Sequence, residues 1–168
     1  GRVSPLQEKQ LTTLGENIVT LEVNGSFDDC QRMVKEAFVD PELTGRVPLT
    51  SANSINVGRL IPQAFYYLFA FSRLKRKTAG ELVFTVPSGN FGNLTAGILA
   101  WRWGMPANAF VAATNINDVV PEFLNTGVYR PRPSVRTLAN AMDVGNPSNF
   151  ERLRRVFDAG SLAITSML

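Results

Sequence analysis

Strand-like and helix-like apolar patterns alternate along this 168-residue chain. The clearest unit spans residues 82–103 and consists of the uncharged run LVFTVP, the loop SGNFGN and the helix-compatible run LTAGILAWRW. Pro87 and the glycines interrupt the apolar pattern, so these residues predict a strand, a tight loop and a helix. A second strand is predicted at residues 110–114, before a short helix that Asp118 caps and that runs to Leu124.

The segments on either side continue this alternation. We expect helices at residues 5–14, 27–39, 54–75 and 147–157, strands at residues 17–23 and 47–50, a loop at residues 127–140, and an apolar tail at residues 161–167. The helix at residues 54–75 is apolar on nearly every side, which predicts a buried helix. Together these elements predict a three-layer α/β fold, with a mostly parallel sheet and helices on both faces.

Composition favours a single α/β domain over residues 1–168. With 45% hydrophobic and 18% charged residues, the chain can form one core but not two large domains. It contains no apolar run of membrane-spanning length and no signal-peptide pattern, so we expect a cytoplasmic protein that does not act on membranes. The absence of histidine excludes His-based metal sites and triads, and we expect no bound metal. Cys30, the single cysteine, is predicted to lie in the core.

Charge is distributed unevenly along the chain. Residues 1–45 carry four basic and eight acidic groups, whereas residues 46–168 carry thirteen basic and six acidic groups. The basic part contains the glycine loop, which suits an anionic small ligand. Basic clusters at residues 73–77, 130–136 and 152–155 lack interleaved aromatic residues, so we expect no nucleic-acid partner.

The loop at residues 88–93 has the composition of an anion-binding site. Gly89 and Gly92 lack Cβ atoms, so the backbone can adopt positive φ there and approach a ligand closely. The amides of residues 91–94 would then point into the loop at the positive end of a helix dipole. SGNFGN has neither the dinucleotide fingerprint nor the P-loop ending, so the residues leave two readings: a site for a smaller phosphate compound, or an ordinary strand-to-helix turn.

A second anion site is predicted where the helix at residues 54–75 begins. Arg59 is the only charged residue within residues 47–72, and an unpaired charge in a protein interior is costly. Either Arg59 reaches solvent or a remote carboxylate, or it holds an anion together with the Ser54 hydroxyl and the Asn53 amide.

SGNFGNLTAGILA closely resembles the phosphate loop of threonine synthases, which are pyridoxal-phosphate (PLP) enzymes of the tryptophan-synthase-β fold type, fold type II. Further stretches resemble successive segments of that family in order: GRVSPLQEKQLTTLGENI, LTSANSINVGRLIPQAFYY, FVAATNINDVVPEFL and LANAMDVGNPSNFERL. The resemblance covers nearly the whole chain. It implies a PLP-dependent lyase of threonine biosynthesis that converts O-phospho-L-homoserine and water to L-threonine and phosphate.

The resemblance also implies roles for individual residues. Those assigned to the PLP phosphate are Gly89, Asn90, Phe91 and Asn93, with Ser88 as a neighbour. Those assigned to the substrate phosphate, through the pattern N-S-x-N-x-x-R, are Asn53, Ser54 and Arg59. Both assignments agree with the anionic ligands that the residues themselves suggest.

The chain departs from the family in one important respect. Fold-type II enzymes hold PLP as a Schiff base on a lysine in a segment that precedes the matched region, and none of Lys9, Lys35, Lys75 or Lys77 lies in such a motif. A carboxyl-terminal portion that contacts the cofactor ring is also unmatched. The resemblance therefore implies the central part of a threonine synthase, inactive alone and without a catalytic residue of its own, from an enzyme that is a monomer or weak dimer.

Two other functions stay open. One is a related PLP enzyme that performs β-replacement or dehydration on a serine or threonine derivative, although such a substrate has no use for the charge of Arg59. The other is a non-catalytic α/β module that binds a phosphometabolite. An absorbance spectrum after PLP addition, with and without borohydride, separates these possibilities.

Overall fold

The computed structural model describes residues 5–25, 27–54, 56–74, 80–157 and 164–167. It divides into two compact units, Gly1–Thr50 and Ser51–Leu168. The sequence predicts one domain over the whole chain, and that remains a prediction. Within the described residues, no helix is both long enough and apolar enough to cross a membrane.

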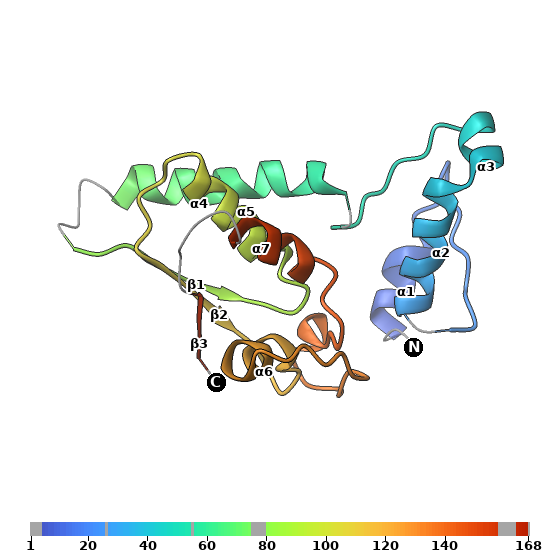
Figure 1. Ribbon diagram of the computed structural model, residues 1–168. Coiled ribbons are helices and arrows are strands. Elements are labelled where there is room, and N and C mark those ends of the chain that lie inside the picture. The colour runs from blue at the N-terminus through green and yellow to red at the C-terminus, as the bar shows by residue number, and fades with distance from the viewer. Residues whose placement is uncertain (1–4, 26, 55, 75–79, 158–163, 168) are drawn as a thin grey trace. The chain divides into compact units, whose positions relative to one another are not determined.

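The unit Gly1–Thr50 contains short helices joined by irregular segments (Figure 1). They are α1 (Pro5–Thr12), α2 (Phe27–Val39) and α3 (Pro41–Arg46). The sequence predicts that Asp40-Pro41 ends the helix at residues 27–39, and in the structure the pair also begins the next helix. The Asp40 carboxylate accepts hydrogen bonds from the amides of Glu42 (2.8 Å) and Leu43 (3.2 Å), which makes Asp40 the N-cap of α3. The sequence also predicts Ser26 as the N-cap of α2, and Ser26 lies outside the described residues.

Both strands predicted in this unit are absent from its described residues. Residues 18–23 are irregular, and residues 47–50 follow α3 without forming a strand. A strand needs a neighbouring strand to pair its backbone groups, and none is described in this unit. The apolar side chains are correspondingly exposed, Val19 by 80% and Leu21 by 81%. Cys30 is only half-buried, so its predicted place in a core is also wrong.

The unit Ser51–Leu168 is built on a parallel sheet with strand order β1-β2-β3. The strands are β1 (Val83–Pro87), β2 (Ala109–Ala113) and β3 (Ile164–Met167). In the register, Val83 lies opposite Ala109, and Phe110 lies opposite Ile164. The apolar tail thus contains a strand that the pattern did not predict.

Helices connect these parallel strands, as parallel pairing requires. They are α5 (Gly92–Arg102) between β1 and β2, and α6 (Val119–Thr126) and α7 (Phe150–Phe157) between β2 and β3. Figure 1 shows α5 and α7 on one side of the strands, together with α4, and α6 on the other side. An open parallel sheet with connecting helices confirms the predicted α/β class.

Helix α4 (Leu60–Leu74) follows the 3-10 turn η1 (Val57–Arg59) and is buried on one side only. Because the helix starts at Leu60, Pro62 falls in its first turn, where proline is tolerated. The prediction of burial all round is wrong for this unit, because the described residues cover one face only. The buried residues are Leu60, Ala64 and Tyr67, and the large exposed ones include Ile61, Phe65, Tyr66 and Phe69.

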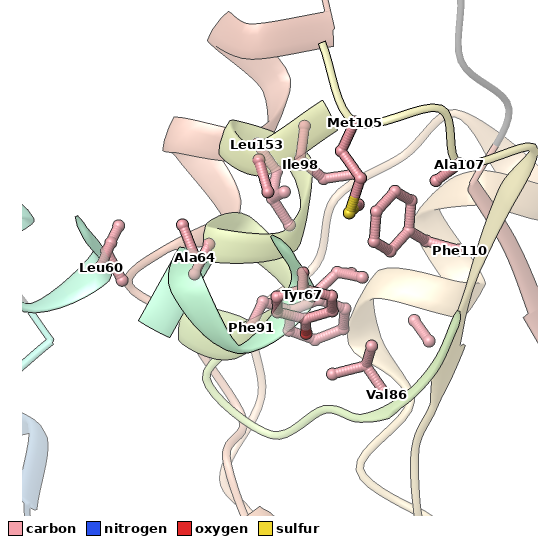
Figure 2. Close-up of a cluster of buried hydrophobic side chains, with 14 of the residues drawn as sticks. Leu60, Ala64, Tyr67, Val86, Phe91, Ile98, Met105, Ala107, Phe110 and Leu153 are labelled. Carbon is pink, nitrogen blue, oxygen red and sulfur yellow. The ribbon is translucent and has the colours of Figure 1, made fainter. Parts of the chain in front are cut away.

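The core lies where α4, α5 and α7 meet the sheet (Figure 2). Phe110 of β2 is completely buried, and its ring stacks on Phe84 with centroids 5.6 Å apart. Tyr67 meets Phe84 edge-on at 5.0 Å, and burial raises the pKa of Tyr67. Gly97 makes this packing possible, since a Cβ there would lie 2.7 Å from Phe110 Cε1. The core therefore holds α5, with its N-terminal loop, close against the sheet.

Candidate anion-binding site

The loop between β1 and α5 leaves the carboxyl end of the sheet at Ser88. The Ser88 amide donates to the Ala113 carbonyl (2.8 Å), and its hydroxyl donates to the Val86 carbonyl (2.8 Å). Ser88 is buried, and its hydroxyl proton is used inside the protein. Its contribution is to fix the start of the loop against the sheet.

A run of unpaired backbone amides follows. Within the described part of the chain, the N–H groups of residues 89–94 have no hydrogen-bond acceptor. The next amide, that of Thr95, donates to the Phe91 carbonyl at 2.9 Å. The unpaired amides lie at the positive end of the α5 dipole, where anions are stabilised. This segment has the donors of an anion cradle without any lysine or arginine.

The glycines of the loop act differently from the prediction. Positive φ occurs at Phe91 (60°), whereas neither Gly89 nor Gly92 adopts it. Gly89 is required by close packing instead, because a Cβ there would lie 2.7 Å from the Cα of Met142. Phe91 is 4% exposed, so its ring anchors the loop in the core and only its backbone is available to a ligand.

Asn90 connects three segments that are distant in sequence. Its Nδ2 donates to the Ser54 hydroxyl (2.9 Å), and its Oδ1 accepts from the Ser148 amide (2.6 Å) and hydroxyl (3.0 Å). The predicted cofactor loop and the predicted substrate-phosphate segment are therefore adjacent. Both ends of the Asn90 side chain are used in these contacts, which leaves its backbone amide for a ligand.

The Asn93 side chain is also bonded within the protein. Its Oδ1 accepts from the Tyr67 hydroxyl at 2.5 Å, and its Nδ2 donates to Gln63 Oε1 at 3.1 Å. These contacts tie the first turn of α5 to α4. Like Asn90, Asn93 can offer its backbone amide to an anion, and its side chain positions the loop.

The predicted substrate-phosphate residues lie just before α4. Asn53 Oδ1 accepts from the Ser54 amide (2.6 Å) and hydroxyl (3.2 Å), so the two side chains form a compact turn. Arg59 is exposed, and its guanidinium donates to the Ala52 carbonyl. The premise that Arg59 is an interior charge is therefore wrong, because solvent and a carbonyl satisfy it. Its role toward a phosphate remains a prediction.

Three functional candidates were missed by the sequence interpretation. Ser148, Asn149 and Arg152 lie at the start of α7, where we predicted only a helix N-terminus. Arg152 Nη1 donates to the Ser54 carbonyl (2.6 Å) and to Asn149 Oδ1 (2.5 Å). The only available signal was the density of polar residues in NPSN, which is equally typical of a helix cap.

The loop at residues 127–140 is held to the carboxyl end of β2 by Asp143. Its carboxylate accepts from the Thr137 amide (2.8 Å) and hydroxyl (2.7 Å) and from Asn115 Nδ2 (2.8 Å). The hydrogen bonds from Thr137 hold the pKa of Asp143 below its usual range. Asn117 adds contacts with both backbone groups of Val135. The loop is thus anchored at the carboxyl end of β2 by a polar network.

Fold and site together define a parallel α/β protein with a run of unpaired backbone amides at a helix N-terminus, next to the carboxyl end of a strand. No protein-family model matches the chain. It is 53% identical over 157 residues to the threonine synthase of Buchnera aphidicola subsp. Baizongia pistaciae. The aligned residues cover 94% of this chain and 36% of that protein.

Solved structures show the same relationship. The crystal structure of threonine synthase from Escherichia coli matches 99% of this chain and 40% of that one, with a TM-score of 0.88 and 48% identity. The PLP-bound threonine synthase from Brucella melitensis matches with a TM-score of 0.72 and 42% identity, over 91% of this chain and 33% of that one. This chain is a homologue of threonine synthases, and it spans between a third and two fifths of the length of these relatives.

Proposed function

We propose that this chain forms the central part of a threonine synthase, a PLP-dependent lyase that converts O-phospho-L-homoserine and water to L-threonine and phosphate. The observation that carries the proposal is the set of unpaired amides at residues 89–94, in a segment whose sequence resembles the phosphate loop of these enzymes. The identity of 53% to a threonine synthase supports it.

The phosphate of PLP fits the donors that this loop offers. A phosphate group presents several acceptor oxygens, and the amides of residues 89–94 are donors without acceptors in the described structure. When bound, PLP supplies an electron sink for chemistry at the amino acid substrate. Asn90 and Asn93 would hold the loop in shape, while Asn53, Ser54 and Arg59 would bind the phosphate of the substrate.

A chimera tests the proposal. The matched segment of the E. coli threonine synthase is replaced by this chain, and phosphate release from O-phospho-L-homoserine is measured with added PLP. We expect activity in the chimera, because the two folds agree over 99% of this chain. We expect none from the 168-residue chain alone, since none of its lysines lies in a PLP-lysine motif.

The unmodified E. coli enzyme is the positive control. Turnover by the purified chain alone would show that one of its own lysines takes the catalytic role, contrary to the proposal. A folded chimera that binds PLP and acts on serine or threonine, but not on O-phospho-L-homoserine, would favour the β-replacement or dehydratase alternative.

We further propose that the complete enzyme acts in the cytoplasm as a monomer or weak dimer, without a membrane or nucleic-acid partner. The structure supports the absence of a nucleic-acid partner, because two arginines of the basic clusters are engaged by carboxylates. Arg132 pairs with Asp118 and Glu122, and Arg155 pairs with Glu151 at 2.5 Å. These pairs reduce the positive potential that a nucleic acid would require.

A further inference from the structure

A fully buried amide group at the start of α7 has a donor without an acceptor. Asn149 is 0% exposed, and its Nδ2 has no hydrogen-bond partner among the described residues. Native structures pair nearly all buried polar groups, because an unpaired donor loses its hydration without compensation. We therefore expect an acceptor for this N–H group in the working protein.

Arg152 determines which way the amide of Asn149 points. A guanidinium donates hydrogen bonds and cannot accept them, so the group facing Arg152 Nη1 at 2.5 Å must be the Asn149 oxygen. The NH2 group of Asn149 consequently faces another direction. Arg152 is itself held by the Ser54 carbonyl at 2.6 Å, so this orientation is tied to the predicted substrate-phosphate segment.

The free NH2 group lies beside the first residue of α5. A Cβ placed on Gly92 would be 3.4 Å from Asn149 Nδ2. The surrounding backbone amides of residues 89–94 also lack acceptors in the described structure. The side-chain donor at the start of α7 therefore lies next to Gly92, which is one of the residues with an unpaired backbone amide.

We propose that Asn149 is an additional binding residue for the phosphate at this cradle, and that Arg152 is the positioning residue that orients its amide. The inference rests on the proposed function, because it takes the phosphate to be that of PLP. A single anion at this place accepts from both kinds of donor. Asn149 adds a neutral side-chain donor to the backbone donors of the loop at residues 88–93, which has no basic residue.

The test uses the full-length enzyme that contains this chain, with PLP removed. Asn149→Asp keeps the oxygen that accepts from Arg152 and puts a second oxygen where Nδ2 stands. We expect its PLP affinity, measured by absorbance titration, to fall roughly 10- to 100-fold, as for the loss of a hydrogen bond to a charged group. We also expect inorganic phosphate to stop raising the Tm of the apoenzyme, an effect that a purely structural role would not produce.

Two further variants and a control complete the experiment. Asn149→Ala removes the donor without adding charge and should also weaken PLP binding. Arg152→Lys should cause a smaller loss, because the amide becomes free to rotate. The control is Asn146→Ala, an exposed residue of the same loop that accepts from the Tyr129 hydroxyl at 3.0 Å. We expect this control to bind PLP within about twofold of the wild type, as is usual for surface substitutions.

The inference is overturned if both Asn149 variants bind PLP within twofold of the wild type. It is also overturned if they raise KM for O-phospho-L-homoserine while PLP affinity stays unchanged, since the donor would then serve the substrate phosphate. A wild-type enzyme that binds no PLP would instead contradict the proposed function.

Discussion

The two compact units differ in what covers their apolar side chains. In Ser51–Leu168, residues such as Phe110, Leu94 and Leu153 are almost completely buried in a common core. In Gly1–Thr50, none of the apolar residues with a described environment is buried, and Val19 and Leu21 are exposed by 80% or more. An apolar pattern shows what a segment can bury, whereas its neighbours determine whether burial occurs.

Two apolar segments, residues 109–113 and residues 18–23, illustrate the difference. Residues 109–113 form β2 because β1 and β3 lie on either side and pair with its backbone. Residues 18–23 (IVTLEV) contain four β-branched residues against one in residues 109–113 (AFVAA), yet they are irregular, and no strand is described beside them. Strand propensity therefore reflects fit to a pleated surface and does not replace a partner.

The largest expected difference between the units concerns two exposed arginines, Arg59 in Ser51–Leu168 and Arg46 in Gly1–Thr50. In the full-length enzyme, we expect Arg59→Ala to lower kcat/KM for O-phospho-L-homoserine about 30- to 1000-fold, or about 2 to 4 kcal/mol, and Arg59→Lys to lower it less. A guanidinium grips two phosphate oxygens, whereas Lys keeps only the charge. PLP affinity should change little in either variant. Steady-state kinetics and PLP titration measure both effects.

Arg46→Ala provides the matched control in the other unit. Arg46 pairs with Glu42 at 2.7 Å, and both side chains are 73% exposed. Such a surface pair contributes about 0 to 1 kcal/mol to stability, and we expect unchanged kinetics. Wild-type kcat/KM in a folded Arg59→Ala enzyme would assign Arg59 a structural role instead.

Glycine-to-alanine substitutions should have opposite effects in the two units. In α5, Gly97→Ala places a Cβ 2.7 Å from Phe110 Cε1 and 2.8 Å from the Tyr67 ring, which we expect to destabilise the unit by about 1 to 3 kcal/mol. In α3, Gly45→Ala meets nothing within 4 Å and should stabilise the helix by about 0.5 to 1 kcal/mol. Urea unfolding followed by amide hydrogen exchange reports the two units separately. Equal effects at both positions would contradict the contrast in packing.

The smallest expected effect depends on pH. The folded-state pKa of Asp143 is lowered by its hydrogen bonds from Thr137, so its ionised form stabilises the fold above its unfolded pKa. That stabilisation is lost as the pH falls through the lower folded value, which lies below 3.8. Asp143→Asn should therefore lower Tm at pH 7, and the difference from the wild type should shrink as the pH falls below 3.8. Thermal unfolding at several pH values measures it.

Asp40→Asn is the matched control for Asp143. Asp40 caps α3 through its side-chain oxygen, and Asn caps helices about as well as Asp, so we expect little change in Tm at pH 7. An equal loss of Tm in both variants would show that the Asp143 network contributes no more than a helix cap.

Much of the site could be predicted from local sequence. The strand, loop and helix at residues 82–103 follow from short-range pattern, because a β-branched run, a proline and two glycines restrict the backbone locally. The unpaired amides at the start of α5 could be predicted for the same reason, since free amides at the N-terminus are a property of any helix, and anion binding there stays a prediction. The positive φ was assigned to the wrong residues: it occurs at Phe91, whose ring is buried, and not at Gly89 or Gly92.

Sequence by itself determined the α/β class, the strand–loop–helix unit at residues 82–103 and the kinship with threonine synthases, because each depends on residues that are close together along the chain. Only the tertiary structure decided which face of α4 is covered, where β3 pairs, and how the donors meet. Asn90 contacts Ser54 and Ser148 across 36 and 58 positions, and Arg152 reaches Ser54 across 98. Contacts of this kind depend on packing between distant segments, and no local pattern records them.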